Sequence, residues 1–171
     1  MYHIAVLQSP YEAITRSIER LDFGESGGVV ITCLDRISGL GEEYDFVVIS
    51  HDAAKQEDWS CGQISRCGIL LVPGKYAVRA AEVITSGCIV DYGLSSRDTI
   101  TLSSIETKQV VLAIQREFIT LNKTVLDRQE VPIRYKNMPP EALMALAGSL
   151  IILGVPVEEL SEQIIYTNVE K

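Results

Sequence analysis

Aromatic residues, basic residues and long apolar runs are all scarce in this chain, and each shortage excludes a class of function. Aromatic side chains make up 6% of the 171 residues, with a single tryptophan, Trp59. Asp and Glu outnumber Lys and Arg by 23 to 15, giving a net charge of −8. This charge argues against nucleic-acid binding, because neutralising phosphates requires clustered Lys and Arg. No apolar run reaches the roughly 18 residues that span a bilayer.

The amino terminus lacks the features of a secretory signal. The opening segment, MYHIAVLQSP, has no basic residues followed by an apolar stretch and no small-residue cleavage site. We therefore expect a cytoplasmic protein that has no membrane association.

The four cysteines do not have the spacing of a metal or redox site. Five residues separate Cys61 from Cys67, whereas zinc and redox motifs use the closer Cys-x-x-Cys spacing. A nearby histidine and aspartate leave a metal site open as an alternative, but we expect no metal and no cofactor. Cys33 and Cys88 lie inside apolar stretches, which predicts small buried side chains.

The first half of the chain alternates apolar runs with helical patterns. The predicted strands are residues 3–8, 28–33, 44–50, 67–72 and 88–91, and the predicted helices are residues 10–21 and 75–85. Near-continuous Val, Ile and Leu strands are typical of sheets that helices cover on both faces. The pattern therefore predicts an α/β fold with a mainly parallel, doubly wound sheet.

From residue 99 the apolar pattern changes to alternation, which predicts a small antiparallel meander from segments 99–105, 109–117 and 124–135. Leu121-Asn122-Lys123 supplies a hairpin turn in which Asn122 tolerates a positive φ. A covering helix at 139–153, stopped by Gly154, and a short helix at 157–165 follow. We expect one domain over 1–171, with a parallel part (1–98), hairpins (99–135) and closing helices (139–166).

Four segments, in this order, carry a resemblance to a known family. They are ILLVPG at 69–74, IVDYGLSSRDTITLSSI at 89–105, EVPIRY at 130–135 and PPEALMALAGSLIILGVPVEEL at 139–160. Together they resemble the second half of the Mur ligase central domain. That domain binds ATP in the enzymes that add amino acids to UDP-muramyl precursors and in the related folylpolyglutamate synthetases.

The chain departs from this family where the family binds ATP. The family places a Gly-rich P-loop after its first strand, whereas residues 7–12 here, LQSPYE, contain neither Gly nor Lys. Pro10 removes an amide donor and Glu12 adds a negative charge. The family's adenine-contacting motif is replaced by residues 72–75, and the Asn that begins its closing helix is Glu141. The resemblance therefore implies the fold and argues against ligase activity.

The carboxyl ends of the predicted strands are where open α/β sheets bind ligands. Ser9, His51, Asp52 and Lys75 lie there, and we take them as candidate ligand-binding residues. Each also has a simpler reading: Ser9 as a helix cap, and the others as ordinary loop or solvent-exposed residues. Trp59, in a polar loop, is a candidate partner contact. We assign no catalytic residue.

Two functions stay open. The first is a non-catalytic binding or regulatory module of Mur-ligase-like fold, which holds a partner protein or a small ligand and is linked by the resemblance to cell-wall precursor metabolism. The second is an enzyme component, whose site is completed by a partner chain or uses an unrelated chemistry near His51. The apolar segment 143–153 fits a core helix and, as an alternative, an oligomer face, so a homo-oligomer also stays open.

Overall fold

The computed structural model describes residues 1–8, 11–21, 28–60 and 65–167. The strands are β1 (Tyr2–Leu7), β2 (Val29–Leu34), β3 (Glu43–Ile49), β4 (Ser65–Pro73), β5 (Ile84–Tyr92), β6 (Ile100–Ile105), β7 (Gln109–Ile114), β8 (Phe118–Ile119), β9 (Val125–Leu126) and β10 (Gln129–Arg134). The helices are α1 (Tyr11–Ile18), α2 (His51–Ala54), α3 (Ala77–Val83), α4 (Pro140–Ile152) and α5 (Leu160–Thr167). Short 3-10 turns are η2 (Ile37–Gly39), η3 (Gly74–Tyr76) and η4 (Val157–Glu159).

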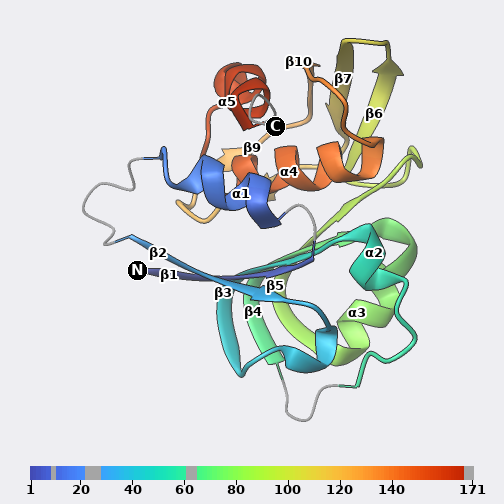
Figure 1. Cartoon of the computed structure of the whole chain (residues 1–171). Helices are drawn as coiled ribbons and strands as arrows, with labels where there is room; N and C mark the ends of the chain where they lie inside the picture. Colours follow the sequence, from blue (N-terminus) through green and yellow to red (C-terminus); the bar gives the residue numbers. More distant parts are fainter. Residues whose placement is uncertain (9–10, 22–27, 61–64, 168–171) are drawn as a thin grey trace.

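One eight-stranded sheet runs through the molecule in the order β10-β7-β6-β5-β4-β3-β1-β2 (Figure 1). Neighbouring strands are parallel along β2, β1, β3, β4, β5 and β6. β7 and β10 extend the sheet beyond β6 in antiparallel pairing. β8 and β9 form a separate antiparallel hairpin. The predicted α/β class, with a mainly parallel sheet, added antiparallel strands and a C-terminal helix, is confirmed.

Helices cover both faces of the sheet, and each side has its own core. The larger core lies under α1, α4 and α5, and the smaller one lies between the sheet and α2 and α3 (Figure 1). Every residue from 143 to 152 in α4 is buried. This confirms that the apolar segment is a core helix. No helix in the described part of the chain is long and apolar enough to cross a membrane.

β2 is the terminal strand of the sheet, which the apolar pattern did not indicate. Val30, Thr32 and Cys33 are exposed, although the pattern predicts a strand covered on both faces. The prediction that Cys33 is buried is therefore wrong, because nothing in the described structure packs beyond this edge. Cys88 in β5 is only half-buried, so the same prediction also overstated its burial.

The turns that end the hairpin and α4 follow from local backbone chemistry. The positive φ of the 121–123 turn belongs to Lys123, at 67°, and not to Asn122 as predicted. The Asn122 side chain instead accepts a 3.2 Å hydrogen bond from the Thr124 amide. Gly154 has a φ of 98° and ends α4 as predicted.

Candidate functional site

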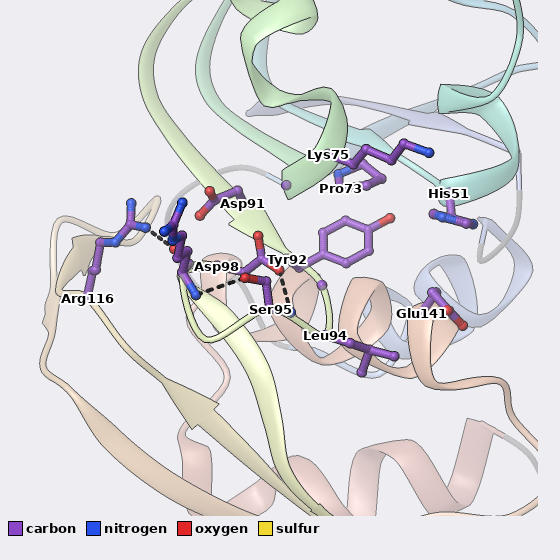
Figure 2. Close-up of a pocket in the computed structure, with 13 residues that line it drawn as sticks. His51, Pro73, Lys75, Asp91, Tyr92, Leu94, Ser95, Asp98, Arg116 and Glu141 are labelled. Carbon is purple, nitrogen blue, oxygen red and sulfur yellow. Dashed lines mark hydrogen bonds between the residues drawn. The ribbon is translucent and has the colours of Figure 1, made fainter.

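A cavity of about 520 Å³ opens at the carboxyl ends of β4 and β5 (Figure 2). Its walls come from the β4–η3 turn, the β5–β6 loop, the first residues of α2 and α4, and Arg116 beyond β7. We call it the Asp98 cavity after the aspartate on its wall. Its volume lies within the range of small-molecule sites.

Asp98 is held in place by a tight turn and by two glycines. Its side chain accepts a 3.0 Å hydrogen bond from the Ser95 amide, and its own amide donates to the Ser95 carbonyl at 3.0 Å. A Cβ at Gly74 would lie 2.8 Å from Asp98 Cγ, and a Cβ at Gly93 would lie 3.2 Å from it; each would be nearer still to a carboxylate oxygen. The space that the carboxylate occupies therefore depends on glycine at both positions.

The environment of Asp98 favours its protonated form more than water does. Burial raises the pKa of the Asp98 carboxyl above its ordinary value, and the nearby Asp91 raises it as well. The Ser95 amide and the charge of Arg116 oppose this change without cancelling it. Only 8% of Asp98 is exposed, so the cavity wall contains a carboxyl group that a suitable ligand would desolvate at little further cost.

Asp91, at the end of β5, joins the two ends of the loop that carries Asp98. One oxygen of Asp91 accepts hydrogen bonds from the amide of Thr99 at 2.8 Å and from its hydroxyl at 2.5 Å. This oxygen is therefore already used in fixing the loop. Asp91 positions the wall of the cavity, and Asp98, which accepts a hydrogen bond from the Ser95 amide, is the more buried of the two carboxyl groups.

Basic side chains lie on both sides of these acids. Figure 2 shows Arg116 on one side of Asp98, and Lys75 and His51 on the other side. The Arg116 guanidinium donates to the Arg97 carbonyl, which holds it at the cavity wall. The lining thus offers charges of both signs, an arrangement that recognises polar, charged molecules better than apolar ones.

Tyr92 forms a structural part of the cavity wall. Its side chain is 1% exposed, and its hydroxyl donates a 2.9 Å hydrogen bond to the Ile49 carbonyl in β3. Burial, followed by the charges of Glu141 and Asp52, raises the pKa of the Tyr92 hydroxyl. Tyr92 therefore stays protonated at neutral pH and ties β5 to β3 below the cavity.

Two of the four candidate ligand-binding residues meet at the Asp98 cavity. His51, the first residue of α2, and Lys75, in η3, both line it. Asp52 is outside the lining, and its exposed carboxylate forms an ion pair with Lys55 at 3.7 Å. Ser9 lies outside the described residues.

Trp59 belongs to the smaller core. It is 4% exposed, its ring stacks on Tyr76 at a centroid distance of 6.1 Å, and its indole N–H donates to the Gln56 carbonyl at 2.9 Å. The Arg79 guanidinium covers the ring at 5.0 Å. So little of the indole is accessible that the expected partner contact has no surface to use.

The sequence patterns did not assign Asp91, Asp98, Arg116 or Glu141 to a site, although all four line the cavity. Asp91 was visible as the end of a predicted strand, and that position is a signal for ligand binding. Arg116 gave no such signal, because it reaches the cavity only through the antiparallel pairing of β7 with β6.

The described residues include no group of three or more His, Cys, Asp or Glu side chains arranged to hold a metal ion. Comparison of the whole sequence with models of known protein families and with curated proteins finds no match.

Proposed function

We propose that this chain is a non-catalytic binding or regulatory domain that holds a small polar ligand in the Asp98 cavity. The observation that carries the proposal is the buried Asp98 carboxyl. Gly74, which follows β4, and Gly93, which follows β5, lack the side chains that would fill its space. The Asp98 carboxylate accepts one hydrogen bond, from the Ser95 amide, which stabilises the loop. Burying the rest of a carboxyl group still lowers stability unless it gains a further partner. A ligand that bonds to the carboxyl accounts for its position.

The connection between β1 and α1 supports a function that does not use ATP. β1 ends at Leu7 and α1 begins at Tyr11, so the connection is shorter than a P-loop. Gln8, with a φ of 62°, donates through its side-chain amide to the Asp35 carbonyl at 2.9 Å. The Tyr11 amide donates to the Gln8 carbonyl at 3.0 Å. By the resemblance to the Mur ligase family, this connection corresponds to the loop with which that family binds phosphates.

The same proposal includes the expectations that rest on the resemblance. We infer that the chain derives from a Mur-ligase-like domain, acts in the cytoplasm and takes part in cell-wall precursor metabolism. A domain of this kind would act by binding, either on a metabolite or on a protein that presents a polar segment to the Asp98 cavity.

Isothermal titration calorimetry with Mg-ATP and with a UDP-muramyl peptide tests the part of the proposal that concerns ATP. We expect no saturable heat with Mg-ATP, because residues 7–12 contain neither the glycines nor the lysine of a phosphate-binding loop, and Pro10 has no amide to donate. Saturable Mg-ATP binding with a dissociation constant of about 1 µM, or roughly −8 kcal/mol, would show that the domain retains the nucleotide chemistry of the family. Binding of the UDP-muramyl peptide alone would support the link to cell-wall precursors.

A further inference from the structure

The two edges of the eight-stranded sheet differ in how they are protected. At the β10 edge, Pro132 has no amide to donate, and Ser161 of α5 covers the neighbouring groups. The Ser161 hydroxyl donates to the Pro132 carbonyl and accepts from the Arg134 amide, both at 3.2 Å. Proline, charged residues and a covering helix are the means by which proteins prevent edge-to-edge pairing.

Among the residues that the structure describes, the β2 edge has none of these protections. In the described structure β2 pairs with β1 alone. The Tyr2 amide donates to the Gly28 carbonyl, and the Gln8 amide donates to the Leu34 carbonyl. Because the backbone groups of a strand alternate in direction, the amides and carbonyls of Val29, Ile31 and Cys33 point away from the sheet.

The composition of β2 suits pairing with an identical strand. Its sequence, VVITCL, has no charged residue, and β-branched side chains favour strands. Val30 is 43% exposed, and Thr32 and Cys33 are exposed as well. In a chain with a net charge of −8, an uncharged strand adds no local charge repulsion between two copies.

A hollow beside the strand continues this surface. It has a volume of about 360 Å³ and lies between α1 and β2. Tyr11, Ile18, Val29 and Ile31 provide apolar walls, and Thr15 and Glu19 add a polar side. Side chains of a strand added to β2 would enter the hollow from the α1 face. An added strand would therefore gain both backbone hydrogen bonds and apolar contacts.

We propose that β2 pairs in antiparallel fashion with β2 of a second copy of this chain, across a two-fold axis at Ile31. This register places Ile31 opposite itself and Val29 opposite Cys33, so every outward-pointing backbone group finds a partner. Opposite residues then share a face, and the α1 helices of the two copies lie on the same side of the joined sheet. The proposal goes beyond the function of the Asp98 cavity and does not depend on it.

Sedimentation equilibrium of the full chain, compared with a Val30→Lys variant and a Val78→Lys control, tests the dimer. Val30 lies next to the proposed axis, whereas Val78 is 77% exposed on α3. We expect the wild type and Val78→Lys to dimerise alike. Val30→Lys should weaken the dimer by about tenfold or more, since it places two additional positive charges beside the axis.

A wild type that stays monomeric at every concentration overturns the proposal. In that case, a strand of a different protein would be the remaining partner for β2. Equal dimerisation of Val30→Lys and Val78→Lys overturns it as well, because the dimer would then use another surface. Circular dichroism of the variants confirms that each is folded when it is measured.

Oxidative cross-linking tests the register. In a Cys33→Ser background, Ile31→Cys places two cysteines opposite each other, and the Cα atoms of a hydrogen-bonded pair, about 5.5 Å apart, are within disulfide range. Thr32→Cys is the control, because Thr32 would face Val30 of the second copy. We expect a disulfide-linked dimer from Ile31→Cys and much less from Thr32→Cys. Equal yields from both variants, or none from Ile31→Cys, contradict the proposed pairing.

Discussion

Replacing Gly74 by alanine should lower the free energy of unfolding by about 2 kcal/mol, and should do so only while Asp98 is present. The added Cβ would lie 2.8 Å from Asp98 Cγ. The Asp98 carboxylate cannot move freely, because it is buried and bonded to the Ser95 amide. Urea unfolding of the single and double variants measures the effect, provided that the slope with denaturant stays constant.

The double-mutant cycle separates this contact from a general effect of alanine in the turn. In an Asp98→Ala background, Gly74→Ala should change the unfolding free energy by less than about 0.5 kcal/mol, since the oxygen that it would meet is gone. Gly39→Ala is the matched control, because the nearest atom to its Cβ, Leu34 Cδ2, is at an ordinary 3.4 Å. A cost of Gly74→Ala that is the same in both backgrounds would mean that the glycine serves the backbone and not the carboxylate.

Replacing Gly68 by alanine should lower the unfolding free energy by about 3 kcal/mol, the largest single effect that we expect. The new Cβ would lie 2.8 Å from the backbone carbonyl oxygen of Asp45 in β3. A backbone atom cannot turn aside as a side chain can, and β3 and β4 pair on both sides of this point. A Cβ added at Gly87 in β5 would likewise lie 2.9 Å from the backbone carbonyl oxygen of Gly68. The two glycines thus let three neighbouring strands approach closely.

Thr85→Ala in β5 is the control for this variant, because Thr85 is exposed near the same part of the sheet. We expect it to change the unfolding free energy by no more than about 0.5 kcal/mol. Urea unfolding of both variants makes the comparison. If Gly68→Ala costs no more than Thr85→Ala, the strands can separate locally at this point, and the close approach is not a constraint on the fold.

The parallel strands and α4 could be predicted from the sequence because their signals are local. Apolar runs mark buried strands, and Pro140 and Gly154 mark the ends of a helix. The position of β2 at the edge could not be predicted in the same way. A run rich in Val and Ile is typical of a central strand and also of an edge strand that has a neighbour on one side only. The exposure of Cys33 could therefore not be predicted from the run.

The candidate site was less predictable because it is assembled from distant segments. The rule that ligands bind at the carboxyl ends of strands singled out His51 and Lys75, and both line the cavity. The contact of Asp98 with Gly74 joins a turn and a loop on different strands, and no spacing within the sequence indicates it. Trp59 was also hard to place from the sequence. Its polar loop suggested exposure, whereas the indole packs against Tyr76 and donates a hydrogen bond to the Gln56 carbonyl.

Chemical-shift mapping by NMR is the most direct test of the claim that the Asp98 cavity binds a small polar ligand. The ¹⁵N-labelled chain would be titrated with a panel of inorganic phosphate, dicarboxylic acids, amino acids, diamines and nucleotides. We predict that at least one of these compounds shifts the amides of Gly74, Gly93 and Ser95 saturably, and that Gly74→Ala weakens its binding by about tenfold or more. A panel in which no compound shifts these amides, or in which every binder shifts only amides elsewhere, would contradict the claim.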